Sequence, residues 1–339
     1  MARVVVTGGA GYIGSHAVRA LTDAGHAVAV LDDMSAGHEA AVPQGVPIVR
    51  ARIHDRAAVA KLLSAHQADA VMHFAAWLAV GESVQKPLDY YQNNVTGTLG
   101  VLDAMREVGV KRFIFSSTCA VYGEPSRVPI DETLEKNPIN SYGETKLTIE
   151  RALPHVERAY GIKWVALRYF NAAGAHPDGS IGEDHADEVH VIPLAIRAAT
   201  GGTPLKVFGE DYPTPDGTCL RDYIHVCDLA DAHIRALEAL ERGAPSGAFN
   251  VGTGTPHSVK SVIDTVSRVV GSPVAWQSAP RRPGDPAVLY AAADRARNEL
   301  GWRPNYADLE VIVRHAWQWH SRHPDGYSSP AQPPPRAAG

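Results

Sequence analysis

The stretch Ala2-Arg-Val-Val-Val-Thr-Gly-Gly-Ala-Gly-Tyr-Ile-Gly14 decides the fold of this chain. Residues 2–6 form a short β-branched run, which is typical of a buried parallel strand. Residues 13–23 then have the pattern of a helix, and the turn between them contains Gly8, Gly11 and Gly14. A glycine-rich turn before a helix brings free N–H groups and the positive end of the helix dipole toward an anion. We therefore expect the pyrophosphate of a dinucleotide to bind here, the alternative being a glycine turn without a ligand.

A second strand is predicted over residues 27–31, and it ends at Asp32-Asp33. An acid at this position is typical of dinucleotide sites, where it holds the adenosine ribose. Two carboxylates repel a 2′-phosphate, and no arginine follows closely to bind one. The pattern favours NAD over NADP.

Strands and helices alternate through the first half of the chain. Further strands are predicted at 70–74, 112–116 and 164–169, and helices at 87–108 and 142–160. This βαβ repetition predicts an α/β fold with a doubly wound parallel sheet, that is, a Rossmann fold. Pro154 cannot donate a hydrogen bond to residue 150, so we expect a kink or a break in the second helix.

Beyond Asn171 the loops become longer and richer in Gly, Pro and Asp, with helices expected at 191–200, 262–270 and 309–319. We expect an NAD-binding Rossmann domain over residues 1–170. A smaller α/β substrate domain mainly covers residues 171–325, with some segments returning to the Rossmann sheet. Residues 326–339, which include Pro330 and a run of three prolines, are expected to form a flexible tail.

Composition excludes several classes of function. The net charge of −5, without a basic tract, argues against a nucleic-acid partner. No apolar run approaches the ~18 residues needed to span a membrane. Cys119, Cys219 and Cys227 are odd in number and lack metal-ligand spacing, which fits a reducing cytoplasm. No His-x-x-x-His pair with a third carboxylate is present, so no metal site is expected.

The segment Asn140-Ser-Tyr-Gly-Glu-Thr-Lys146 carries the candidate chemistry. Tyr142 and Lys146 lie on one face of the predicted helix, one turn apart. A phenol with a pKa of about 10 is a poor base at neutral pH. A neighbouring ammonium favours the phenolate, so the pair can act as a general base toward a sugar or alcohol hydroxyl.

These segments resemble the UDP-glucose 4-epimerases, a family of extended short-chain dehydrogenases, from Arg3 to about Tyr327. The similar segments are residues 7–16, 73–76, 80–83, 90–95, 113–118, 121–123, 168–176, 208–209, 221–226 and 279–285. The resemblance implies inversion at carbon 4 of UDP-glucose and UDP-galactose, through a transient 4-keto sugar and tightly bound NAD, in galactose metabolism. It also implies a homodimer formed through the helices at 87–108 and 142–160.

The resemblance assigns roles by position. Tyr142 takes the proton of the sugar 4-hydroxyl, Lys146 holds the nicotinamide ribose and lowers the pKa of the phenol, and Thr118 bridges the tyrosine and the substrate oxygen. The cofactor-binding residues implied are Gly8, Gly11, Tyr12, Ile13, Gly14, Asp32, Asp33, Ile53, Phe74, Ala75, Ala76, Asn93, Ser116, Tyr142, Lys146 and Tyr169. The substrate-binding residues implied are Thr118, Asn171, His190, Phe208, Arg221, Arg282, Asp285 and Leu289.

Four positions bear on affinity and substrate choice. The two guanidiniums of Arg221 and Arg282 suit the charge of a diphosphate. Arg52 stands where the family commonly has an acid near the adenine, which is expected to weaken cofactor retention. In the family, the position of Leu289 lines the sugar pocket, and a tyrosine there blocks N-acetyl groups. Leucine therefore predicts UDP-glucose and UDP-galactose as the main pair, with some turnover of N-acetyl sugars.

Other functions compete with this one. A nucleotide-sugar 4,6-dehydratase typically has Asp-Glu after the catalytic Thr, whereas Cys119-Ala120 follow Thr118 here, so dehydration is disfavoured. A 4-epimerase of another UDP-sugar (an N-acetylhexosamine, a glucuronate or a pentose) is the closer alternative. An NAD-binding regulatory protein without turnover is a third reading, which the Tyr142 and Lys146 pair disfavours.

Overall fold

The computed structural model describes residues 1–282 and 285–328. Its centre is a seven-stranded parallel sheet with the order β10-β6-β5-β4-β1-β2-β3. The strands are β1 (Arg3–Thr7), β2 (Ala27–Asp32), β3 (Ile48–Arg50), β4 (Ala70–His73), β5 (Arg112–Thr118), β6 (Lys163–Tyr169) and β10 (Gly247–Val251). The strand order reverses between β1 and β4, where a doubly wound sheet binds its ligand. The predicted Rossmann fold is confirmed.

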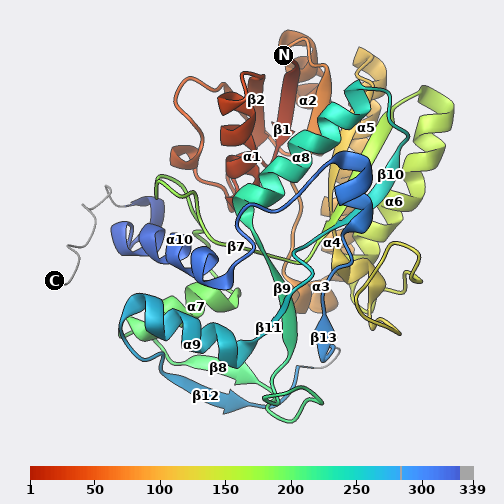
Figure 1. Ribbon diagram of the computed structural model, residues 1–339. Helices are drawn as coiled ribbons and strands as arrows, with labels where there is room; N and C mark the ends of the chain where they lie inside the picture. Colours follow the sequence, from red (N-terminus) through yellow and green to blue (C-terminus); the bar gives the residue numbers. More distant parts are fainter. Residues whose placement is uncertain (283–284, 329–339) are drawn as a thin grey trace.

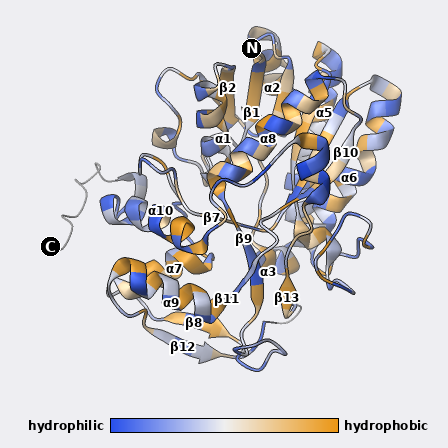
Figure 2. Ribbon diagram, in the orientation of Figure 1, coloured by the Kyte–Doolittle hydropathy of each residue, from blue (hydrophilic) through white to orange (hydrophobic). Residues whose placement is uncertain are grey.

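Helices cover both faces of this sheet (Figure 1). Helices α1 (Tyr12–Asp23) and α8 (Val226–Glu241) lie on one face, and α2 (Arg56–Ala65), α5 (Gly97–Val108) and α6 (Ser141–Tyr160) on the other. Successive residues of β1 point to opposite faces, so Val4 and Val6 belong to one hydrophobic core and Val5 to the other. In Figure 2 the helices around the sheet carry both hydrophilic and hydrophobic stretches. A parallel sheet buried on both faces explains the β-branched strand sequences.

The predicted helix at 87–108 is interrupted by a π-helical turn. It consists of α4 (Pro87–Tyr90), the π turn η2 (Tyr91–Thr96) and α5. Asn94 in this turn is buried, accepts a hydrogen bond from Trp77 N at 2.9 Å and donates one to Trp77 O at 3.0 Å. Such turns are frequent at functional sites. This one fixes the loop that follows β4.

Helix α6 runs from Ser141 to Tyr160 with Pro154 inside it. Of the two outcomes predicted for Pro154, the break is therefore wrong, and the kink stays a prediction. The proline ring faces solvent, while Ile149 and Leu153 pack into the core. One missing hydrogen bond is therefore offset by the packing of a long amphipathic face. At the start of the helix, Gly143 N donates to Asn140 Oδ1 at 2.9 Å and caps it.

The second half of the chain builds a smaller part at the carboxyl edge of the sheet (Figure 1). Its helices are α7 (Val191–Ala199), α9 (Val259–Val270) and α10 (Leu309–Arg322). Its strands are β7 (Asn171–Ala173), β8 (Leu205–Phe208), β9 (Leu220–His225), β11 (Pro256–Ser258), β12 (Trp276–Ala279) and β13 (Val288–Leu289). Short elements connect the rest: η1 (Glu39–Ala41), α3 (Val80–Gln85), η3 (Cys119–Tyr122), η4 (Ala296–Leu300) and η5 (Gly326–Ser328). A core of its own, which includes Ile196, Val262 and Ile312, holds the three helices together.

The structure continues past residue 325, where the flexible tail was predicted to begin. Tyr327 N donates to Asp184 Oδ2 at 2.9 Å, and its hydroxyl donates to Gly182 O at 3.1 Å. Its ring packs on Trp319, which explains why this turn is held in place. The remainder of the predicted tail, residues 329–339, lies outside the described residues. Among the described helices, none combines the length and apolarity that a bilayer crossing requires.

A buried ion pair ties α6 to the far strands of the sheet. Arg168 Nε donates to both carboxylate oxygens of Glu150, at 3.0 and 3.1 Å, and the two side chains are 7% and 5% exposed. Arg168 Nη1 also donates to the hydroxyl of Tyr122 at 2.8 Å, and that hydroxyl donates to Asn250 Oδ1 at 2.7 Å. Ser117 Oγ donates to Glu150 at 2.5 Å. The network joins β5, β6 and β10 to α6.

Glu150→Gln should lower the free energy of unfolding by about 3 kcal/mol, because it leaves the Arg168 guanidinium buried without a counter-charge. Urea unfolding followed by circular dichroism measures this. The exposed Glu241→Gln is the control and should change stability by less than about 0.5 kcal/mol. Equal stability of the two variants would show that the pair contributes nothing.

Candidate functional site

A cavity of about 410 Å³ lies at the carboxyl ends of the central strands, and its wall includes residues of both parts of the chain. All the predicted cofactor-binding residues line it: Gly8, Gly11, Tyr12, Ile13, Gly14, Asp32, Asp33, Ile53, Phe74, Ala75, Ala76, Asn93, Ser116, Tyr142, Lys146 and Tyr169. Of the predicted substrate-binding residues, Thr118, Asn171, His190, Arg221, Asp285 and Leu289 also line it. The fold therefore gathers segments that are far apart in the sequence around one space.

The glycine loop leaves no room for side chains. Gly8 has a φ of +71°, and a Cβ there would lie 2.5 Å from Ala75 N. A Cβ on Gly14 would lie 2.0 Å from Gly8 O. Helix α1 begins directly after Gly11, which has no side chain to cap it, so its first N–H groups are available to an anion. This cradle fits the pyrophosphate of a dinucleotide.

The two acids after β2 have different surroundings. Asp32 is buried and accepts hydrogen bonds from Ala10 N and Met34 N, both at 2.9 Å, so it braces the glycine loop. Asp33 accepts from Ser35 N at 3.0 Å and lies 3.8 Å from the guanidinium of Arg52. Arg52 thus partly offsets the acidic charge where the adenosine end of a dinucleotide would bind.

The candidate catalytic residues come together on two elements. Thr118 ends β5, and Tyr142 and Lys146 lie on the facing turn of α6. Lys146 is buried, its Nζ donates to Ser116 O at 2.9 Å, and it lies 6.0 Å from the centre of the Tyr142 ring. The Ser116 and Tyr169 hydroxyls are hydrogen-bonded to each other at 2.5 Å.

The electrostatics of this pair differ from the sequence-based expectation. Burial raises the pKa of Tyr142 far above its ordinary value, and a hydrogen bond from Thr118 only partly opposes the rise. Burial also lowers the pKa of Lys146 to about 7. Burial thus outweighs the hydrogen bond with Thr118 in the net shift of the phenol. The effect of Lys146 on the pKa of the phenol stays a prediction, since the leading contributions to this shift come from other groups.

On the substrate side, the guanidinium of Arg221 lies in the cavity wall. Arg221 is ion-paired with Asp285, and its Nη1 donates to Leu220 O at 2.8 Å. Arg282 instead lies over the ring of Phe208, with its guanidinium carbon 3.9 Å from the ring centre. Within the described residues, the cavity wall does not include Phe208 or Arg282. The structure thus leaves these two predicted residues beside the cavity.

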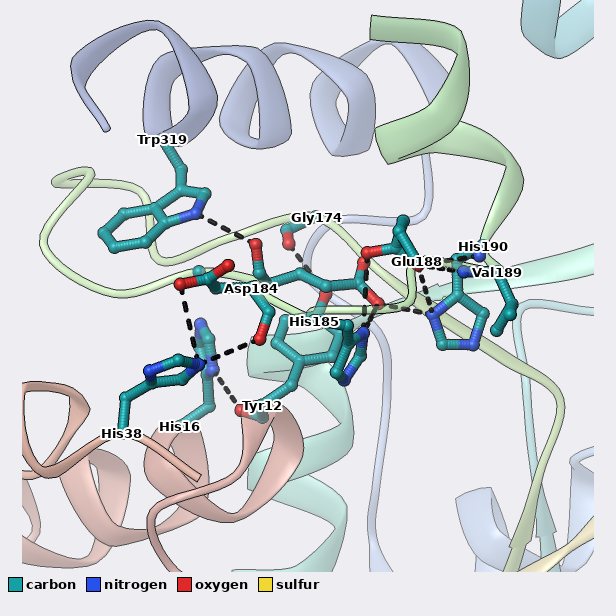
Figure 3. A network of polar contacts seen from close by, with 12 residues as sticks. Tyr12, His16, His38, Gly174, Asp184, His185, Glu188, Val189, His190 and Trp319 are labelled. Atoms are coloured by element: carbon teal, nitrogen blue, oxygen red, sulfur yellow. Dashed lines mark hydrogen bonds and ion pairs between the residues drawn. The ribbon is translucent and has the colours of Figure 1, made fainter. Parts of the chain in front are cut away.

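His190 belongs to a cluster that sequence reasoning missed. Its Nδ1 contacts the carboxylates of Glu183 and Glu188, and His185 contacts the same two (Figure 3). Although burial opposes the shift, bonding to Glu183 and Glu188 raises the pKa of His185 to about 10. The signal was present in the sequence as Glu183-Asp-His-Ala-Asp-Glu-Val-His190, in which six of eight side chains are carboxylates or imidazoles. Both histidines line the cavity.

Comparisons with known proteins agree on one family. The sequence profile described as the NAD dependent epimerase/dehydratase family matches residues 4–252. A UDP-glucose 4-epimerase of Halalkalibacterium halodurans is 50% identical over 327 residues, which cover 96% of this chain and 98% of that protein. The solved UDP-glucose 4-epimerase of Brucella ovis in complex with NAD is 46% identical, with a TM-score of 0.91, covering 94% and 98% of the two chains. That of Bifidobacterium longum with NAD+ and UDP is 37% identical, with a TM-score of 0.90, covering 96% and 99%.

Gly14→Ala should remove NAD binding, because its Cβ overlaps Gly8 O and displaces the loop. Wild-type protein, denatured after purification, should release NAD(H) into the supernatant, whereas the variant should release almost none. The control is Gly81→Ala, where φ is not positive and an added Cβ meets nothing within 4 Å. Equal dinucleotide content in Gly14→Ala and wild type would contradict the assignment, and none in wild type would show that Arg52 weakens retention.

Proposed function

The chain belongs to the NAD-dependent epimerase/dehydratase family, and on that basis we propose that it is a UDP-glucose 4-epimerase. It interconverts UDP-glucose and UDP-galactose with NAD as a tightly held cofactor. The observation that carries the proposal is the convergence of Thr118, Tyr142 and Lys146 on the cavity that the glycine loop opens. The epimerase relatives, one of them solved with NAD+ and UDP, support it.

The residues of the site suit acid–base chemistry at carbon 4. NAD+, when bound, supplies the hydride acceptor and a cationic ring whose charge favours the phenolate that burial alone disfavours. Tyr142 then takes the proton of the 4-hydroxyl, with Thr118 as the bridging hydroxyl. After the 4-keto sugar turns its other face, Tyr142 returns the proton. Lys146, held by Ser116 O, positions the nicotinamide ribose.

Inversion requires a firm grip on UDP and a loose grip on the sugar. Arg221 supplies the charge for the diphosphate, and its pairing with Asp285 fixes the direction of the guanidinium. His190 and Asn171 present polar groups to the same cavity. Around the sugar, Leu289 contributes an apolar side chain, which leaves the ring free to rotate.

We further propose a homodimer. Apolar side chains are exposed along α3, α4 and α5, including Val84 at 62%, Leu88 at 81% and Leu99 at 43%. These helices pack against α6, the other helix of the predicted interface, and exposed apolar patches are typical of protein–protein interfaces. Analytical ultracentrifugation at micromolar concentration measures the assembly, and a single 36.3 kDa species would contradict the proposal.

A cytoplasmic role in galactose metabolism is also proposed. Cys119, Cys219 and Cys227 are unpaired, which supports a reducing compartment. Fractionation of the source cells with an antibody against this chain locates it directly. Detection in a secreted or envelope fraction alone would contradict the proposal.

Tyr142→Phe should lower kcat by several orders of magnitude, because it removes the proton acceptor, while the affinity for UDP stays nearly unchanged. Steady-state kinetics and calorimetric titration with UDP separate the two effects. Tyr160→Phe, an exposed tyrosine at the opposite end of α6 that is not in the cavity wall, is the matched control. Near-native turnover of Tyr142→Phe would show that another residue is the base.

The substrate is tested by incubation with a panel of UDP-sugars without added NAD, followed by product analysis. We expect UDP-glucose and UDP-galactose to be the best pair, with weaker turnover of the N-acetyl sugars. Leu289→Tyr should abolish N-acetyl turnover and spare UDP-galactose, because the larger ring overfills the pocket. Leu289→Ile is the size-matched control.

The other outcomes of the panel point to the competing functions. Preference for a glucuronate or a pentose would replace the proposed substrate. No turnover of any sugar by NAD-loaded protein would favour the regulatory alternative. Absence of N-acetyl turnover in wild type would assign the restriction to Trp77 or Tyr290 instead of Leu289.

A further inference from the structure

Four side chains of the segment 183–190 converge on one point at the wall of the cavity. The ligand atoms of Glu183, His185, Glu188 and His190 all lie within 4.8 Å of one another. Figure 3 shows the histidine rings pointing at the carboxylates from the loop that precedes α7. Tyr12 of the cofactor loop lies beside them, with its ring centre 6.3 Å from that of His185.

The separations of these atoms suit a divalent cation. Four ligands at about 2.0 to 2.1 Å from a tetrahedral metal are roughly 3.3 Å from each other. His185 Nδ1 lies 3.3 Å from Glu183 Oε1 and 3.4 Å from Glu188 Oε2. His190 Nδ1 lies 3.6 Å from Oε1 of Glu188, the other oxygen of that carboxylate. The separation between His190 and Glu183 is too short for two ligands of one ion, so binding requires a rotation of the partly buried His190 imidazole.

The ligands are held by the structure around them. Glu188 Oε1 accepts hydrogen bonds from Val189 N at 2.7 Å and His190 N at 2.8 Å, which orients Oε2 toward His185. The carbonyl of Glu183 accepts from Trp319 Nε1 at 3.1 Å. Such supporting bonds orient metal ligands in known sites. The cluster is therefore arranged before any ion arrives.

Burial and charge give the cluster a reason to bind a cation. The carboxylates of Glu183 and Glu188 are only 3% and 2% exposed, whereas the imidazoles are 18% and 31% exposed and lie on the cavity side. A doubly charged ion matches the charge of the two buried carboxylates, and imidazoles bind a metal ion in their neutral form.

We propose that Glu183, His185, Glu188 and His190 form a binding site for a first-row divalent cation, with Zn²⁺ as the fitting member. Two imidazoles and two carboxylates are donors that Zn²⁺ accepts in four-coordinate sites. The site goes beyond the epimerase function and revises the expectation that the chain has no metal site. It would fix the loop before α7 and, through Nδ1 of His190, set the orientation of the other ring nitrogen in the cavity wall.

The test uses full-length, tag-free, NAD-containing protein that has been dialysed against dipicolinate and then titrated with Zn²⁺. We expect calorimetry and elemental analysis to show one equivalent of zinc per chain, and Co²⁺ to give the visible absorption of a four-coordinate site. His185→Ala and Glu188→Gln should each lower zinc affinity at least about 10-fold, the lower end of the range for weakened metal sites.

Matched controls separate this site from surface binding. His155→Ala and Glu241→Gln, both exposed and outside the cluster, should bind zinc as wild type does. Circular dichroism and NAD content show whether each variant is folded, and two independent site variants allow for the failure of one. Equal zinc binding by wild type and the site variants would overturn the proposal. Failure of wild type to take up zinc would do the same, since the cluster would then be only an ion-pair network. Loss of zinc uptake in the control variants would also overturn it.

Discussion

The glycine loop contacts the segment Phe74-Ala75 that follows β4, and this contact positions the walls of the cavity. Phe74 N and Ala75 N both donate to Thr7 O, at 2.9 and 3.1 Å, and Gly8 N donates to Leu31 O at 2.8 Å. Three strands are thus joined at the point where the sheet order reverses. Because Gly8 approaches the backbone of Ala75 closely, only a residue without a Cβ allows this junction. The cofactor cradle and the wall opposite it are consequences of the same packing.

Sequence patterns predicted the strands and helices that their own local sequence determines. The β-branched runs of β1, β2, β4, β5 and β6 were found because a strand buried on both faces is apolar at nearly every position. Helix α8 was missed although its apolar residues recur with a helical period as clear as that of α5. The π turn at 91–96 depends on the contact of Asn94 with Trp77, which no local pattern contains.

The features of the candidate site also divide into those set by local sequence and those set by the folded chain. The glycine turn, Asp32-Asp33 and the Tyr142–Lys146 spacing are local motifs, and the structure brings them to one cavity. The sign of the Tyr142 pKa shift was not available from the sequence, because it depends on how much water the folded chain removes. The stacking of Arg282 on Phe208 and the convergence of residues 183–190 depend likewise on the folded chain. Their final roles, as opposed to their positions, rest on the experiments above.

The network of Arg168, Glu150, Tyr122 and Asn250 has a consequence for the order in which the molecule is built. Its last member lies on β10, which pairs with β6 across some eighty residues of intervening chain. Helix α8, which covers one face of the sheet, is also synthesised late. A nascent chain that has left the ribosome only as far as β6 therefore has an unpaired sheet edge and an uncovered apolar face. The first half of the chain therefore depends on β10 and α8 to complete its sheet and cover its apolar face. During synthesis these surfaces must be protected until both elements have been made.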